Sequence, residues 1–189
     1  MIHQYENLGI WIHCDGWFTP AFTTYGFVTG PDETGTFIKD LARFLDTAYE
    51  NDILVTLVLW NGATSMKDGL RGLINDEQKL QSYIDNALTP MVKELSNKVA
   101  LGAWEIMNEP EGSVAINSDG NPCFDTSILQ GSGAGWTGEN VPMANFLKFF
   151  NLQIAAIKKQ DPKALATIGS WCERPQTDNF GFRNYYKDE

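Results

Sequence analysis

The chain has 189 residues, of which 43% are hydrophobic and 12% are aromatic. This length supplies one well-packed core and is too short for two large ones, so we expect a single domain over residues 1–189. The formal net charge of -10 disfavours binding to the phosphate backbone of nucleic acids. No apolar run approaches the roughly 20 residues of a membrane-spanning helix, so no membrane segment is expected.

Histidines and cysteines are scarce, and this limits the metal chemistry of the chain. There are two histidines, His3 and His13, and three widely separated cysteines, Cys14, Cys123 and Cys172. Without a C-x-x-C pair or a histidine cluster, a zinc site is not expected, and we predict neither a metal nor another cofactor. Three cysteines cannot all pair with each other, and their spacing does not say which of them, if any, form a disulfide.

Four short apolar runs predict strands over residues 8–12, 53–60, 100–107 and 164–169. Their apolar residues are continuous rather than alternating, which is typical of strands buried on both faces of a parallel sheet.

Helical spacing of apolar residues predicts three helices between these strands, over residues 37–48, 80–95 and 146–157. Pro90 should kink the second helix or break it near Thr89. Asp161 and Pro162 should end the third helix. The tail, residues 177–189, is predicted to lead into a further helix.

Alternating strands and helices indicate an α/β fold, either doubly wound or a barrel. Two connections are long for ordinary loops, residues 61–76 and 109–141. Each follows the carboxyl end of a predicted strand, where α/β enzymes carry their active sites.

The segment WEIMNEPEG, residues 104–112, is the clearest candidate for chemistry. A buried strand ends there in an amide, Asn108, a carboxylate, Glu109, and a proline. At the mouth of a sheet Glu109 would be half shielded from water, which favours the protonated form needed for general acid catalysis. Asn108 could hold a sugar hydroxyl or a partner carboxylate. On spacing alone, a motif that merely terminates a strand is an equally good interpretation.

This motif resembles the fourth-strand signature of family 5 glycoside hydrolases, which are (β/α)8 barrels. Other stretches resemble one group in that family, the animal-type endo-β-1,4-mannanases of molluscs and other invertebrates. They are WIH (11–13), TPAF (19–22), GFVTG (26–30), LWNGA (59–63), KLQSYID (79–85), GSGAGW (131–136) and GSW (169–171). The resemblance runs in order from about residue 7 to residue 189. It implies a partial (β/α)8 barrel, about strands two to five of eight.

The resemblance implies a retaining two-carboxylate hydrolase of β-1,4-mannosidic bonds in mannan, galactomannan or glucomannan, with Glu109 as acid/base and Asn108 beside it. The family's nucleophile lies on strand seven, which this sequence lacks along with strand one and the other C-terminal strands. An arginine expected on strand two is replaced here by Gly9. We therefore expect the isolated chain to be inactive. The alternatives are a related endo-glucanase and an inactive, truncated sugar-binding fragment.

Side chains near the strand ends supply candidates for substrate binding. Trp60, Trp136 and Trp171 could stack on pyranose rings, and Asn61, His13 and Glu111 could form hydrogen bonds with sugar hydroxyls. The competing interpretation is core packing for the tryptophans and a structural role for His13. Packing is the better expectation for Trp11 and Trp104, and Glu105 is expected to be an inward-facing carboxylate with a structural partner.

The expected binding partner is a β-mannan polysaccharide or oligosaccharide, with no obligatory protein partner. The resemblance also implies an extracellular enzyme.

Overall fold

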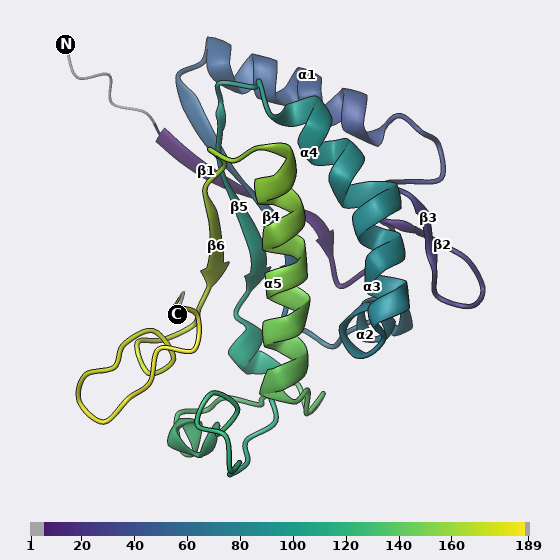
Figure 1. Ribbon diagram of the computed structural model, residues 1–189. Coiled ribbons are helices and arrows are strands. Elements are labelled where there is room, and N and C mark those ends of the chain that lie inside the picture. Colours follow the sequence, from purple (N-terminus) through teal and green to yellow (C-terminus); the bar gives the residue numbers. More distant parts are fainter. Residues whose placement is uncertain (1–5, 188–189) are drawn as a thin grey trace, which may run out of the picture.

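The structure of the chain is a computed structural model that describes residues 6–187. Four strands, β1 (Glu6–Cys14), β4 (Ile53–Asn61), β5 (Leu101–Asn108) and β6 (Ala166–Gly169), form one sheet in the order β1-β4-β5-β6. All three pairings are parallel, as the predicted α/β fold requires. Helices α1 (Phe37–Glu50) and α5 (Met143–Gln160) lie in the predicted crossovers, and all helices pack on one side of the sheet (Figure 1).

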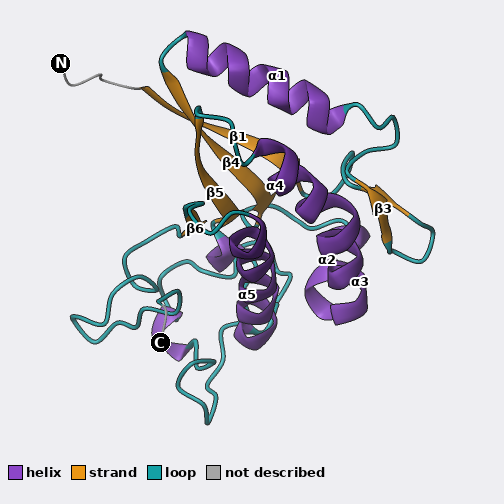
Figure 2. Cartoon of the chain, turned by 45° about the horizontal axis from the view of Figure 1, so that its top comes forward, coloured by secondary structure: helices purple, strands orange, loops and turns teal. Residues whose placement is uncertain are grey.

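The second crossover is built from several short helices. They are α2 (Asp68–Asn75), α3 (Glu77–Tyr83), the π-helical turn η1 (Ile84–Leu88) and α4 (Thr89–Leu95). A small antiparallel hairpin, β2 (Ala21–Phe22) and β3 (Val28–Gly30), follows β1, and two 3-10 turns, η2 (Pro110–Gly112) and η3 (Ser127–Leu129), lie in the loop after β5. Figure 2 shows how much of this loop and of the tail is irregular.

The two faces of the sheet differ in burial, except on β4, where residues of both faces are buried. Register places Ile10, Leu57 and Trp104 on one face, where Leu57 and Trp104 are buried beneath the helices. The opposite, inner face carries the row Trp11, Val58, Glu105 and Thr167.

Trp11 is 52% exposed, so the expectation that it packs inside the protein is wrong for this chain. It lies on the edge strand β1, where no described element covers the inner face. Trp104 does pack in the core, at 1% exposure.

Pro90 changes the type of helix rather than ending it. Asp76 caps α3, and its carboxylate accepts the N–H groups of Gln78 and Lys79 at 2.9 and 3.3 Å. The chain then passes through η1 into α4, which holds Pro90 in its first turn. Because proline has no N–H and clashes with the preceding turn of an α-helix, the wider π turn just before it accommodates the ring. The predicted interruption near Thr89 takes this form.

Two expectations about the loops are corrected. Helix α2 lies inside the stretch predicted as a long connection, because its buried residues, Leu70, Leu73 and Ile74, form too short a run to reveal a helix. The tail was expected to lead into a helix, but residues 177–187 form turns without one, and residues 188–189 lie outside the described part.

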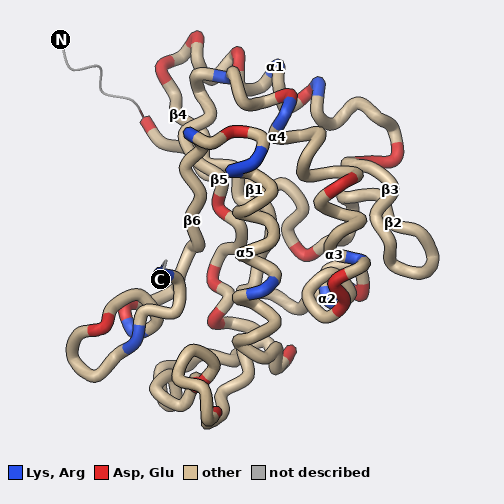
Figure 3. Tube along the Cα trace, viewed as in Figure 1, with Lys and Arg blue, Asp and Glu red and all other residues tan. Residues whose placement is uncertain are grey.

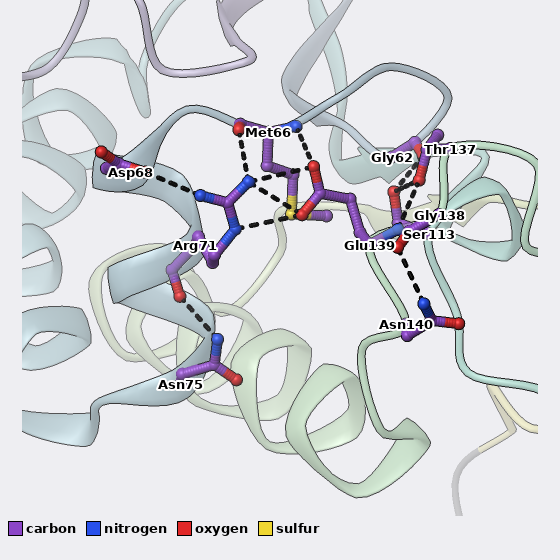
Figure 4. A network of polar contacts seen from close by, with 10 residues as sticks. All are labelled: Gly62, Met66, Asp68, Arg71, Asn75, Ser113, Thr137, Gly138, Glu139 and Asn140. Atoms are coloured by element: carbon purple, nitrogen blue, oxygen red, sulfur yellow. Dashed lines mark hydrogen bonds and ion pairs between the residues drawn. The ribbon is translucent and has the colours of Figure 1, made fainter.

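A polar clamp joins α2 to the end of the long loop after β5 (Figure 4). Arg71 donates from Nε and one terminal nitrogen to the Glu139 carboxylate at 3.0 and 3.1 Å, and to the Met66 carbonyl at 3.0 Å. Glu139 also accepts the Met66 N–H at 2.9 Å, and its side chain is only 9% exposed. The clamp fixes the far end of the loop against the helix that follows β4.

Acidic residues are distributed over most elements, in keeping with the net charge of -10 (Figure 3). Within residues 6–187, no helix is long and apolar enough to cross a membrane. The same residues contain no cluster of three metal-ligating side chains. Cys14 and Cys172 are thiols rather than half-cystines.

Candidate active site

The carboxyl ends of the parallel strands meet at one edge of the sheet, and Glu109 lies at the end of β5. Its backbone is left-handed, with φ 46° and ψ 56°. For a residue with a side chain this conformation costs about 1–3 kcal/mol, and such residues concentrate at functional sites. Hydrogen bonds hold it in place: the Glu109 N–H donates to the Gly169 carbonyl, and the Glu109 carbonyl accepts the Gly112 N–H at 3.0 Å. These bonds fix the backbone of Glu109, and the residue lies partly buried at the mouth of the sheet.

Asn108 is held beside Glu109 by the strand next to it. Its Nδ2 donates to Asn61 Oδ1 at 3.1 Å, and the same oxygen accepts the Ala63 N–H at 3.1 Å. Gly62 brings the two loops together, because its N–H donates to the Asn108 carbonyl at 2.7 Å. A Cβ at Gly62 would lie 2.6 Å from the Cα of Pro110, so only glycine fits. Two predicted residues, Asn61 and Asn108, therefore lie together next to Glu109.

Two tryptophans form an exposed aromatic pair at this edge. The rings of Trp136 and Trp171 meet edge to face, with centroids 5.2 Å apart, and each residue is 43% exposed. Trp136 Nε1 donates to the Ala63 carbonyl at 3.0 Å, which fixes its ring over the loop after β4. A Cβ at Gly112 would come within 2.6 Å of the Trp136 ring, so a glycine is needed under it. This arrangement can offer an aromatic face to a sugar ring.

Glu111, predicted to bind substrate, is instead a buried structural acceptor. It is 1% exposed, and its carboxylate accepts hydrogen bonds from Ser170 Oγ at 2.6 Å, the Tyr186 hydroxyl at 2.7 Å and the Trp171 N–H at 3.1 Å. Burial, and then the negative charge of Glu111, raise the pKa of Tyr186 well above its ordinary value, so this hydroxyl remains a donor. Glu111 thus ties the segment after Glu109 to the loop that carries Trp171. Neither Ser170 nor Tyr186 was identified from the sequence.

Trp60 and His13 are also core residues, which contradicts their predicted roles in sugar binding. Trp60 is fully buried, and its Nε1 donates to Gln153 Oε1 at 3.0 Å. His13 is 2% exposed and lies 4.8 Å from Trp60, centroid to centroid. Because the Thr19 hydroxyl donates to a backbone carbonyl, His13 Nδ1 donates to Thr19 Oγ1 at 2.9 Å. Burial lowers the pKa of His13 from 6.5 to about 3, so the ring is neutral.

Glu105 faces the inner side of the sheet, as expected. Burial, and then the charge of Glu109, raise the pKa of the Glu105 carboxyl above its ordinary value. The charge of Glu109 therefore acts on the Glu105 carboxyl at this end of β5.

A cavity of about 610 Å³ lies between α5 and the tail. Leu147, Phe150 and Ile154 line one side of it, and Tyr185 and Tyr186 line the other. It has no carboxylate pair and no exposed tryptophan, so we place the candidate site at the open strand edge.

Comparison with known proteins gives a consistent result. No protein-family model matches the chain. A mannan endo-1,4-beta-mannosidase from Cryptopygus antarcticus is 50% identical over 179 residues, which are 95% of this chain and 47% of that protein. The enzyme of the same name from Mytilus edulis is 46% identical, over 98% of this chain and 51% of its own length. The chain spans about half the length of the curated relatives it matches.

Solved structures agree with these relatives. The endo-1,4-beta-mannanase from Eisenia fetida is 58% identical with a TM-score of 0.94, over 96% of this chain and 50% of that one. The beta-1,4-D-mannanase from Cryptopygus antarcticus is 49% identical with a TM-score of 0.95, over 97% of this chain and 50% of that one. These neighbours are (β/α)8 barrels, which confirms the predicted partial barrel. The chain is a homologue of the animal endo-1,4-β-mannanases and corresponds to about half of their length.

Proposed function

We propose that this chain forms the acid/base-bearing half of a retaining endo-β-1,4-mannanase. The main support is the geometry at the end of β5, where Glu109 has a left-handed backbone conformation beside Asn108. The exposed pair Trp136 and Trp171 lies at the same edge of the sheet. In a retaining mechanism Glu109 would protonate the glycosidic oxygen as the bond to the leaving sugar breaks. A second carboxylate, from sequence outside this chain, would attack the anomeric carbon.

The substrate proposed is a β-1,4-mannan, because the homologues are named for its hydrolysis. The exposed pair Trp136 and Trp171 would stack on the apolar faces of the sugar rings, and Asn108 would hold a hydroxyl of the sugar bound at Glu109. Because polymeric mannan does not enter cells, an extracellular site of action is part of this proposal.

The test requires a closed barrel. The parts of the Eisenia fetida enzyme that this chain does not cover would be joined to it in their own order, giving a hybrid barrel. We expect the hybrid to release reducing sugar from galactomannan and the isolated 189-residue chain to release none. In the hybrid, Glu109→Gln should lower the rate roughly 10²–10⁴-fold, the usual contribution of a general acid. Glu173→Gln, at an exposed position in the loop after β6, is the matched control and should leave the rate unchanged.

Two outcomes would contradict the proposal. Galactomannan hydrolysis that survives Glu109→Gln would show that another group is the acid. A hybrid that hydrolyses carboxymethylcellulose faster than galactomannan would point instead to an endo-glucanase.

A further inference from the structure

Two exposed aromatic residues, Trp17 and Phe18, lie in the loop that follows β1. Trp17 is 59% exposed and Phe18 is 85% exposed, and their rings meet edge to face with centroids 6.2 Å apart. Because β1 runs parallel to β4 and β5, its carboxyl end lies at the same edge of the sheet as Glu109. The two rings therefore lie on the side of the sheet where the candidate site is found.

Trp17 is held in a defined position although it faces solvent. Its backbone N–H donates to Asp15 Oδ1 at 3.1 Å. The Asp15 carbonyl accepts the Lys67 N–H at 3.1 Å, and the Lys67 ammonium lies over the Trp17 ring, 4.0 Å from the ring centroid. Gly16 has a positive φ of 83°, and a Cβ there would lie 3.4 Å from Leu70 in the first turn of α2. Since the indole is already fixed against the start of α2, a ligand that stacks on it loses less conformational entropy.

The loop after β4, residues 62–67, connects this aromatic pair to the candidate site. Near one end of the loop, the Ala63 carbonyl accepts the indole N–H of Trp136 at 3.0 Å. At the other end, Lys67 contacts Trp17. Exposed tryptophans therefore flank one short loop at the carboxyl edge of the sheet.

The distance between Trp17 and Glu109 suits a polymeric ligand. One strand, β4, separates β1 from β5, and neighbouring strands lie about 4.8 Å apart, so the ends of β1 and β5 are about 10 Å apart. A single pyranose unit bound at Glu109 is too short to reach Trp17, whereas a linear polysaccharide can place a further sugar there. The apolar C–H face of that sugar can stack on the indole, and the Lys67 ammonium can donate to its hydroxyls.

We propose that Trp17 and Phe18 form a distal sugar-binding subsite, which stacks a mannosyl residue remote from the bond that is cleaved. The occupant is a β-1,4-mannan chain that runs from Trp136 across the loop after β4 to Trp17. This inference rests on the proposed function, because the chain it binds is the one cleaved at Glu109. The subsite adds to the affinity for long substrates and takes no part in the chemical step.

The dependence of binding on chain length tests this subsite in the hybrid barrel. Glu109→Gln serves as the background, so that bound sugar is not cleaved, and affinities for mannotriose and mannohexaose are measured by isothermal titration calorimetry. We expect Trp17→Ala to weaken mannohexaose binding roughly 3–10-fold, the effect of one aromatic contact, and to leave mannotriose binding unchanged. Phe18→Ala should also weaken only the longer sugar, by a smaller factor.

Tyr49→Ala is the matched control. Tyr49 is 53% exposed, but it lies in the last turn of α1, just before the amino end of β4 and thus near the opposite edge of the sheet. Its removal should change neither affinity. Trp17→Phe keeps an aromatic face and should retain part of the mannohexaose affinity that Trp17→Ala loses.

Two results would overturn the subsite. Equal affinities of Trp17→Ala and its parent for mannohexaose would show that no sugar reaches Trp17. Equal weakening of both oligosaccharides, with a lower free energy of unfolding, would show that the rest of the barrel covers Trp17 instead.

Failure of the proposed function has a different signature. Hydrolysis of mannohexaose by the Glu109→Gln hybrid would remove the assigned acid, and tighter binding of cellohexaose than of mannohexaose would remove the assigned substrate. In either case the loss of affinity in Trp17→Ala, confined to the longer sugar, would still show whether the subsite exists.

Discussion

The hydrogen bonds to Glu111 allow the stability of the site to be tested quantitatively. In Glu111→Ala, Tyr186 O–H and Trp171 N–H lose their acceptor, whereas Ser170 Oγ keeps the Cys172 carbonyl at 3.2 Å. Hydrogen bonds to a charged acceptor contribute about 1.5–3 kcal/mol each. Water can reach the half-exposed Trp171, so its share is smaller. We expect the free energy of unfolding of the hybrid barrel to fall by about 2–4 kcal/mol.

Urea unfolding at pH 7, followed by far-ultraviolet circular dichroism, measures this loss. Glu111→Gln keeps one acceptor oxygen but turns an NH₂ group toward a donor, so an intermediate loss of about 1–2 kcal/mol is expected. Glu173→Ala removes an exposed carboxylate from the same loop and should change stability by no more than about 0.5 kcal/mol. If Glu111→Ala and Glu173→Ala were equally stable, the buried carboxylate would not be holding the loop after β6.

Three further predictions concern other parts of the chain. The pKa of His13 is lowered to about 3, so the unfolded state binds more protons than the folded state between about pH 6.5 and 3. The free energy of unfolding therefore falls as the pH falls through that window. His13→Phe should reduce the difference in this free energy between pH 4.5 and pH 7, as measured by urea unfolding. Arg71→Gln removes the partly exposed clamp and should lower the free energy of unfolding by about 1 kcal/mol or less. It should nevertheless speed proteolytic cleavage within residues 113–141, because the end of this loop is no longer held. Arg43→Gln, which removes an exposed ion pair on α1, is the control. The isolated chain should self-associate through its open sheet edges, and a concentration-independent monomer in sedimentation would contradict this.

The strands and the position of Glu109 were predictable because their signals are local. A continuous apolar run followed by an amide, a carboxylate and a proline marks the end of a buried parallel strand, and Glu109 lies there. Asn61 was found in the same way, as the polar residue that ends the preceding strand.

The roles of Glu111, His13 and Trp60 could not be read from the sequence, because their partners are remote. Glu111 is buried by Tyr186, 75 residues further along a tail without regular structure. Trp60 bonds Gln153, whose position on the buried side of α5 is visible only once the helix is placed. A polar or aromatic residue at a strand end has the same local pattern whether it faces solvent or the core. Distant contacts decide between the two.

The π-helical turn before Pro90 also sets the rotational phase of the helix that contains it. The buried residues of this helix, from Leu80 to Leu95, recur every four positions, whereas an α-helix has 3.6 residues per turn. The wider turn at Ile84–Leu88 absorbs most of that drift, so α3 and α4 present their apolar sides to one core. Removing one residue from the turn would rotate everything after it by about 100° and carry Met91 away from the sheet. The length of this turn therefore acts as a spacer between the two halves of the crossover.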